Sequence, residues 1–581
     1  MDWHTNREIG LVTPLEENVL LFRTMTVKEQ LAGLFRFELD MLSERKDIKF
    51  EEIAGRKITV RLNLPTYEKR YFNGFVTHFR QTGLEGKRYV YHATVHPWLW
   101  FLSRSSNCRI FQNKTVPEIV RQVFREHGFS DYEVRLRGSY RIWEYCVQYR
   151  EIDLNFVNRL LEHEGIYYYF KHENGKHTLV LSDSVSSHGP FPGYEEVSYI
   201  QSAADDDQAK LGWIFDWNMV QKVQPGAVER YAYNYRKSNA PLNARFSAKN
   251  SYPMGNKELF EGPQCAFPER GDGEDYTRKD KQRIVAHGTR ARGNTSARGI
   301  AAGSLFKLAN HWRDNAQYLV VSAVHHLRNN AYESGHAWGK GDVYSCSFTA
   351  CPSNQPFRPL QSTPKPVIHG IETAVVTGPP GEEIYTDELG RVKVQFHWDR
   401  YGKNDHNSSC WIRVSQPWAG DSYGGMCIPR VGQEVTVAFV QGDPDHPMII
   451  GRVYNSDQGT PFNPAEEAHA TVIRTHSTPN GNPNDYNELY FGDEYGNELV
   501  RIRAQYNMAT TVLNNKSVVV RNDFDRVVKE GNFTATVEMG SYVLDAKQQI
   551  VLKCGSSKVT IGPESVVIES PDIQLNPGVK G

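Results

Sequence analysis

The sequence predicts a mainly β protein of several domains that ends in an intertwined β-helix or β-prism built from more than one chain. Three observations support this prediction: a length of 581 residues, short stretches in which apolar and polar residues alternate, and a seven-residue repeat near the carboxyl terminus. A chain of this length is too long for one hydrophobic core, and about 150 residues per domain gives about four units. Aromatic residues make up 12%, and 46 glycines and 29 prolines favour short strands and turns over long helices.

The charge and cysteine content narrow the function classes. The 67 lysines and arginines against 68 aspartates and glutamates leave a net charge of -1, so no basic field attracts nucleic acid. The eight cysteines have no framework spacing and are expected to be reduced thiols. Cys346 and Cys351 form a C-x4-C pair without the second pair that a structural zinc site needs. We therefore expect no cofactor, no metal site and no nucleic acid partner.

The amino-terminal segment does not have the pattern of a signal peptide. Asp2, His4, Arg7 and Glu8 interrupt the apolar core that such a peptide requires. No stretch approaches about 18 uncharged apolar residues, so no transmembrane helix is expected. We therefore expect synthesis in the cytoplasm, and a machine would have to carry the protein out of the cell.

The predicted base spans residues 1–368 and begins with half-buried strands. Apolar and polar side chains alternate over residues 35–41, 58–64 and 89–95, with turn residues between these stretches. A period of two places every second side chain on one face of a strand. We therefore expect elements of a β-barrel or a sandwich in this region.

Two short helices are expected within the base. Thr115 and Glu118 form a capping box at the start of the first helix, which has one apolar face. The second helix spans about 153–164 and leads into a hairpin with an Asn-Gly turn at 174–175.

The pattern is weaker between residues 190 and 370. Strands are expected over 317–324 and 342–348. Six cations lie within 275–292, but acidic residues lie among them, so a solvated helix face is preferred to a phosphate site. Residues 335–340 have the pattern GxxxGK, which is one residue short of a phosphate loop and lacks its strand-to-helix context.

Residues 369–456 are predicted to form a small OB-type barrel. Nucleic acid binding on this barrel would need exposed aromatic residues interleaved with cations, and acidic residues here dilute the positive charge. Residues 457–489 are rich in Asn, Pro, Gly and Thr and are predicted to be a linker or neck that contains no domain. The five short runs expected to be strands of the barrel are 372–376, 391–396, 410–414, 434–439 and 447–453.

The tail, residues 490–581, carries the most specific pattern. A coiled coil would need apolar spacings of three and four and would be broken by Pro563 and Pro577. A spacing of two indicates strands instead. Pairs of core-like residues two apart recur every seven positions: Leu552 and Cys554, Val559 and Ile561, Val566 and Ile568, and Ile573 and Leu575.

Each repeat is one short strand and a corner, which is too thin to bury its apolar side within one chain. The economical solution is a β-prism in which several copies wind round one axis, and three walls are the fewest that enclose a core. Alternation over 533–539 extends this rod back to about residue 490. The alternative is the edge of a plain β-sandwich, which would not need a strict step of seven. The residues predicted to fill the core of the trimeric spike are Leu552, Val559, Ile561, Val566, Ile568, Ile573 and Leu575.

Three motifs resemble a known family. Residues 148–170 have the sequence QYREIDLNFVNRLLEHEGIYYYF, residues 387–394 have DELGRVKV, and residues 429–435 have PRVGQEV. These stretches, in this order, are similar to those of VgrG proteins, the spike subunits of bacterial type VI secretion systems. The resemblance covers nearly the whole chain and implies a phage-hub-like base, an OB barrel and a β-helical spike.

The resemblance also implies a set of partners. It implies a homotrimer whose base has two β-barrels per chain, so that a pseudo-sixfold ring can sit on a hexameric tube of Hcp protein. A PAAR-repeat protein would cap the spike, effectors or adaptors would travel with it, and sheath contraction would drive the protein out through a target membrane. The nearest alternative is the hub and spike protein of a contractile phage tail.

No enzyme activity is expected. Some related phage hubs carry a lysozyme domain between barrel and spike, but residues 456–487 are too short for the cleft that a glycosidase needs. The sequence contains no G-x-S-x-G and no H-E-x-x-H motif. Glu151, Asp153, Glu162 and Glu164 are expected to form the polar face of a short helix. A spike with a hidden hydrolase activity is the less favoured alternative.

Overall fold

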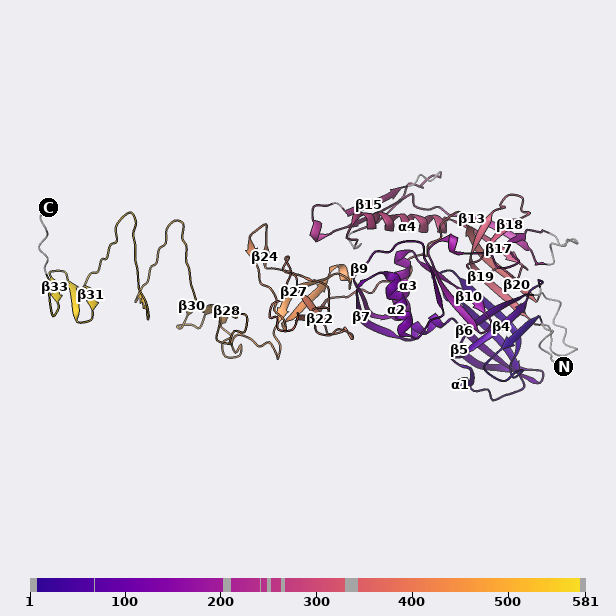
Figure 1. The fold of residues 1–581 in the computed structure, drawn as a ribbon, viewed down its shortest axis with the longest axis horizontal. Helices are drawn as coiled ribbons and strands as arrows, with labels where there is room; N and C mark the ends of the chain where they lie inside the picture. Colours follow the sequence, from indigo (N-terminus) through magenta and orange to yellow (C-terminus); the bar gives the residue numbers. More distant parts are fainter. Residues whose placement is uncertain are drawn as a thin grey trace. The chain divides into compact units, whose positions relative to one another are not determined.

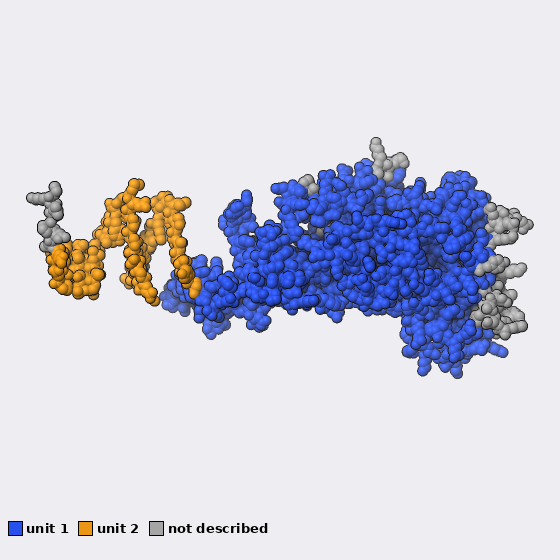
Figure 2. Space-filling view, viewed as in Figure 1, with its two compact units in different colours: residues 1–503 blue, residues 504–581 orange. Residues whose placement is uncertain are grey.

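The computed structural model describes residues 8–66, 68–201, 211–240, 242–247, 252–262, 267–329 and 343–574. The chain divides into two compact units, residues 1–503 and 504–581 (Figure 2). Strands predominate in the first unit, as the sequence predicts. In the described residues, no helix has both the length and the apolar character needed to cross a membrane. The residues 335–340, which resemble a phosphate loop, lie outside the described part of the chain.

One twelve-stranded sheet forms most of the base (Figure 1). Its strands follow the order β1-β4-β5-β6-β3-β2-β19-β20-β17-β13, and β18 pairs with both β12 and β19. The strands are β1 (Ile9–Val12), β2 (Leu21–Gln30), β3 (Arg36–Ser43), β4 (Lys57–Asn63), β5 (Lys69–Glu85), β6 (Arg88–His96), β12 (Glu196–Ser198), β13 (Ile214–Gln221), β17 (Thr289–Thr295), β18 (Leu305–Ala309), β19 (Gln317–Arg328) and β20 (Tyr344–Pro352).

The sheet consists of two six-stranded halves joined where β2 pairs with β19. Ser322 lies opposite Gln30 in this antiparallel pair. In the first half, β1 lies against β2. In the second half, a bridge between Tyr199 and Ile214 connects the segment after β12 to β13. Each half therefore approaches closure and is barrel-like; that these halves are the two β-barrels of a hub stays a prediction.

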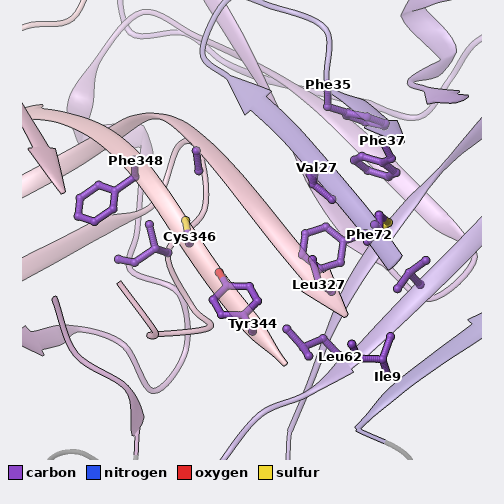
Figure 3. Close-up of a cluster of buried hydrophobic side chains, with 14 of the residues drawn as sticks. Ile9, Val27, Phe35, Phe37, Leu62, Phe72, Leu327, Tyr344, Cys346 and Phe348 are labelled. Atoms are coloured by element: carbon purple, nitrogen blue, oxygen red, sulfur yellow. The ribbon is translucent and has the colours of Figure 1, made fainter. Parts of the chain in front are cut away.

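The alternation predicted for the first strands is confirmed. In β3, Phe37, Leu39 and Met41 are buried, and the residues between them are more exposed. Figure 3 shows part of this core, in which side chains such as Phe72 and Leu327 come from the two halves of the sheet. Every second residue of the strand is therefore apolar and faces the core, because successive side chains of a strand point to opposite sides.

A second core lies around helices α2 (Val116–Glu126) and α3 (Asp153–Glu164). The predicted capping box is present, and the Thr115 N–H donates to Glu118 Oε2 over 2.8 Å. Helix α3 has the predicted bounds and ends at Gly165, whose φ of 70° suits a residue without a side chain. The other elements of this region are β7 (Ser106–Lys114), β8 (Tyr132–Arg135), β9 (Trp143–Ile152), and the hairpin of β10 (Tyr167–Glu173) and β11 (Lys176–Ser182). Helix α1 (Phe50–Ile53) contacts β5 instead, and its Ile53 belongs to the first core.

A small insertion joins helix α4 (Arg270–Gly288) to strands β14 (Ala227–Ala232), β15 (Leu242–Ser247) and β16 (Glu258–Glu261). The helix was predicted, and Arg278 lies on its solvated face with 61% of its side chain exposed, but three other charged residues are not solvated. Lys279, Asp280 and Arg283 are all buried. Asp280 pairs with Arg230 and with Arg283. These charges can be buried because they neutralise one another. The arginines therefore pair with Asp280 and do not form a phosphate site.

The five strands predicted for the OB-type barrel are present. They are β21 (Ile371–Thr377), β22 (Lys393–Phe396), β23 (Arg413–Val414), β26 (Glu434–Phe439) and β27 (Pro447–Val453). Their order is β22-β21-β26-β27-β23, and a bridge between Val392 and Ile412 connects the two ends of the sheet. A short hairpin of β24 (Trp418–Ala419) and β25 (Gly424–Gly425) extends from it.

A three-stranded antiparallel sheet follows the barrel. It contains β28 (Ala470–Arg474), β29 (Glu488–Gly492) and β30 (Leu499–Arg503). Strand β28 lies inside the segment 457–489, so the prediction of a plain linker there is wrong over this strand. The reason is that β28 pairs with β29, in which Tyr490 lies opposite Val472, and the composition of the linker did not indicate this pairing.

Candidate functional site

The seven-residue repeat of the tail forms an antiparallel sheet of three short strands. These are β31 (Ile550–Cys554), β32 (Ser557–Ile561) and β33 (Val566–Glu569). Leu552 lies opposite Val559, and Val559 lies opposite Ile568. The step of seven therefore places equivalent residues side by side across the sheet.

One face of this sheet is almost wholly apolar, because residues that lie directly opposite share a face. The other face carries charged residues, and Lys558 lies 3.7 Å from Glu569 there. Val567 belongs to this second face, although it follows Val566 directly. We name the apolar face the tail ladder; it consists of Ile550, Leu552, Cys554, Val559, Ile561, Val566 and Ile568.

The tail ladder is exposed in the single chain. Val566 is 63% exposed and Leu552 is 55% exposed. A sheet with one uncovered apolar face has no interior, and contiguous exposed apolar side chains mark an interaction surface. The surface can be covered only by something outside these three strands.

The predicted spike residues can now be placed. Five of the seven lie together on the tail ladder: Leu552, Val559, Ile561, Val566 and Ile568. Ile573 is exposed beyond the end of β33 and belongs to no strand. Leu575 lies outside the described residues. Whether these side chains fill a trimer core stays a prediction.

The segment 504–549 differs from the rod that the alternation over 533–539 predicts back to about residue 490. No strand is assigned among these residues, and Phe533, Val537 and Met539 are exposed. A strand needs a neighbouring strand for its main-chain hydrogen bonds, and none pairs with this segment in the part of the chain that the structure describes. The alternation is therefore present in the sequence without a neighbouring strand to pair with.

A second apolar face, which the sequence reasoning missed, lies on the sheet β28-β29-β30. Ile473 lies opposite Leu489, which lies opposite Ile502. Phe491 and Val500 share this face, and most of its side chains are exposed. We name it the neck ladder. Its residues are not seven apart, so a search for the tail repeat could not find them.

The opposite face of the neck sheet is built around a buried carboxylate. Glu488 accepts hydrogen bonds from Arg474 over 2.7 Å and from Arg501 over 2.9 Å. These two arginines lower the pKa of Glu488, against the effect of burial, which would raise it. The carboxylate on the polar face therefore has its hydrogen-bond partners within the chain, whereas the apolar side chains of the neck ladder remain exposed.

The four carboxylates considered as candidate acids were predicted to form the polar face of a short helix, which is wrong for Glu151, because it lies in β9; the other three lie in α3. Glu151, Asp153, Glu162 and Glu164 are all buried. They are buried because each has partners: Glu151 pairs with Arg159, Asp153 accepts from Ser105, His127 and Gln148, Glu162 accepts from Ser362 and Thr363, and Glu164 accepts from Trp143, Tyr276 and Lys279.

Among the described residues, no group of three or more His, Cys, Asp or Glu could hold a metal ion. Cys346 and Cys351 are free and buried. Burial raises the pKa of Cys346 to about 12, which disfavours the thiolate that a zinc site would require. The described residues therefore offer an assembly surface as their main candidate site.

Comparison with family models matches three parts of the chain. Residues 28–331 match the phage tail baseplate hub model, and residues 382–454 match the type VI secretion system and phage-baseplate injector OB domain. Residues 471–569 match the C-terminal trimerisation domain of bacteriophage T4 gp5. The last match contains both the neck ladder and the tail ladder.

Curated relatives cover most of the chain. It is 40% identical to the type VI secretion system spike protein VgrG1a of Pseudomonas aeruginosa, over 97% of this chain and 90% of that protein. It is 41% identical to VgrG1c of the same organism, over 90% of this chain and 72% of that protein. It is 31% identical to the actin cross-linking toxin VgrG1 of Vibrio cholerae, over 94% of this chain but only 50% of the toxin.

Solved structures share the fold. The E. coli c3393 protein, described as a component of the type VI secretion system with similarity to the T4 tail proteins gp27 and gp5, matches with a TM-score of 0.56 and 21% identity. This match covers 76% of this chain and 100% of that one. A chain from the Francisella PdpA-VgrG complex matches with a TM-score of 0.54 and 11% identity, over 85% of this chain and 88% of that one.

Proposed function

Because the chain belongs to the VgrG family of type VI secretion system spike proteins, we propose that three copies assemble so that the tail ladder and the neck ladder become the interior of the spike. The observation that supports this proposal is the exposure of both apolar faces in the single chain. Burying apolar surface contributes about 25 cal/mol per Å², so trimer assembly and tail folding would be one event.

Three copies are the smallest number whose apolar faces enclose an axis. Each copy contributes one sheet wall, and its charged face, with Lys558 and Glu569, stays toward solvent. The same reasoning applies to residues 504–549, which contain the alternation over 533–539 and pair with no strand in the part of the chain that the structure describes. Strands of the neighbouring copies would supply the missing main-chain hydrogen bonds.

The base is proposed to sit on the Hcp tube. Its two barrel-like halves support this partner, since three copies would present six halves to a hexameric ring. A PAAR-repeat protein is proposed at the spike end, and effector or adaptor proteins are proposed as cargo. The protein would leave the cell through the type VI machinery and contact the target-cell membrane only in passing.

We propose that the chain has no enzyme activity and no cofactor, and that it does not bind nucleic acid. The four candidate acids are used in structural pairs, which supports this view. The phage-tail hub and spike remains the alternative, and a hidden hydrolase activity is the less favoured one. Names of phage parts in the matched models favour the first alternative over the second.

Two neighbouring valines provide the test. Val566 lies on the tail ladder and Val567 lies on the opposite face, and both are substantially exposed in the single chain. We expect light scattering of the purified full chain to give about three times the chain mass of 66.3 kDa. Val566→Asp should shift the mass toward that of the single chain at low concentration, and Val567→Asp should leave it unchanged. A monomeric parent chain, or equal effects of the two substitutions, would refute the proposal.

A further inference from the structure

Strand β9 belongs to two hydrophobic cores. Trp143 and Cys146 pack into the core around helices α2 and α3. Tyr145, Val147 and Tyr149 pack instead into the core of the OB-type barrel. The barrel therefore has no self-contained core, and one strand of the base forms part of its wall.

Only one edge of β9 is paired with another strand in the described residues, because its sheet contains β7 and no third strand. The Val147 N–H donates instead to Asp445 Oδ1 over 2.6 Å. The Val147 carbonyl accepts from Arg159 Nη2 over 2.7 Å. A side chain from the barrel and a side chain from α3 thus take the place of a neighbouring strand.

The second oxygen of Asp445 holds the segment that leads from the base into the barrel. Asp445 Oδ2 lies 2.6 Å from Lys365 Nζ, and Asp443 Oδ1 lies 2.5 Å from the same nitrogen. Burial disfavours the ionised form of Asp445, but Lys365 and Arg159 hold its pKa below the usual value. One carboxylate therefore connects the base strand, the connecting segment and the barrel.

Neighbouring contacts strengthen the same joint. The Tyr149 hydroxyl donates to Glu372 Oε1 over 2.6 Å, and its ring lies 5.5 Å from that of Trp398. Arg159 is held in place by a buried pair with Glu151, with Nη2 2.6 Å from Oε1. Glu151 and Arg159 both belong to the stretch 148–170 that resembles the family signature.

We propose that Asp445 is the positioning residue that locks the OB-type barrel to the base, so that a push on the base reaches the spike without bending this joint. The mechanical consequence rests on the proposed spike function; the lock itself does not. Removing the carboxylate would leave the Val147 N–H without its acceptor and would remove one of the two anions beside Lys365.

Hydrogen exchange of the full chain tests the lock. In Asp445→Ala, we expect the amide of Val147 to exchange at least about tenfold faster, because its buried acceptor is gone. Amides in the middle of β26 should keep their protection, since the barrel strands still pair with one another. Asp457→Ala is the matched control, because Asp457 is exposed in the segment that follows β27, where its N–H donates to Asn455 Oδ1.

A conservative variant separates a lock from general damage. Asp445→Asn should speed exchange at Val147 less than the alanine variant does, because the amide oxygen can still accept. Unchanged exchange in Asp445→Ala, or equal exchange in the asparagine and alanine variants, would overturn the proposal.

Measuring the mass of the assembly distinguishes a failure of the Asp445 lock from a failure of the proposed spike function. Asp445 is not part of either ladder, so Asp445→Ala should keep the trimer mass while delivery of the spike from cells falls. A trimer with normal delivery despite loosened exchange would overturn the mechanical role. A parent chain that is not trimeric would refute the proposed function and leave the exchange test of the lock intact.

Discussion

Ile561 and Val566 lie directly opposite each other in the antiparallel pair of β32 and β33, and both side chains belong to the exposed tail ladder. Only four residues separate them, so a tight corner turns the chain back and keeps both on one face. Each corner of the repeat thus adds one more strand to the same sheet and does not cover the apolar face of the strand before it. The three strands β31, β32 and β33 thus share an apolar side and enclose no interior of their own.

The neck ladder should behave like the tail ladder. Val500 lies on the neck ladder, whereas the adjacent Leu499 lies on the opposite face, and both are largely exposed in the single chain. We expect Val500→Asp to weaken the trimer, because it would place a charge in the shared interior. Leu499→Asp should have little effect. Light scattering across a dilution series gives the readout, and equal behaviour of the two variants would contradict the assignment.

Cys554 offers a chemical probe of the same interior. It lies on the tail ladder and is a free, exposed cysteine in the single chain. Three copies round one axis would bring their thiols close together, and a disulfide needs Cα atoms within about 7 Å. With Cys427→Ser as background, mild oxidation should give a cross-linked dimer on a non-reducing gel. Cys554→Ser should abolish it, and a persistent dimer in that variant would count against this geometry.

Glu164 should be important for the stability of the base. It accepts from the Trp143 indole N–H over 3.1 Å and from the Tyr276 hydroxyl over 2.9 Å, and Lys279 Nζ lies 3.0 Å away. Glu164→Ala would leave Lys279 with less compensation in a buried site and should lower the free energy of unfolding by about 3 kcal/mol or more. Glu388→Ala, at an exposed position, is the control. Denaturant unfolding of the two variants should differ, and similar midpoints would contradict the prediction.

The base should lose stability as the pH falls below about 6.5. Burial lowers the pKa of His172, His188 and His325 to about 4, whereas the unfolded chain has histidine pKa values near 6.5. Above pH 6.5 these histidines are neutral in both the folded and the unfolded chain, so they do not lower the free energy of unfolding. Between pH 6.5 and about 4 the unfolded state binds more protons, so the free energy of unfolding falls.

A loss of stability between pH 7.0 and about 5 reflects protonation of histidines more than protonation of carboxylates. Carboxylates with lowered pKa values begin to cost stability only below about pH 4.5, the range in which the unfolded carboxylates take up protons. Thermal melting at pH 7.0, 5.5 and 4.5 should therefore show a falling midpoint already at pH 5.5. His397→Gln, at an exposed ring, should leave the profile unchanged. A flat profile from pH 7.0 to 5.5 would contradict the buried-histidine account.

Local patterns in the sequence determined the short-range structure. The period of two gave the strands of the base, the capping box gave the start of α2, and the glycine after Glu164 gave the end of α3. The step of seven in the tail placed Leu552, Val559 and Ile568 in one row. These features depend on residues that are close in the chain, where spacing fixes which side chains share a face.

Only the tertiary structure decided what the charged residues do and where the cores are divided. Glu164 and Lys279 are 115 residues apart, and Val147 and Asp445 are 298 apart, so neither pair could be inferred from local spacing. From the sequence, Lys279 was expected on a solvated helix face, and Asp445 was only one of the acidic residues of the barrel region. Burial of a charge is favourable only with a partner in place, and the fold alone brings the partner there. The sequence determined that the tail has an apolar face; the structure determined that, among the described residues, this face is left exposed, unlike the buried charges.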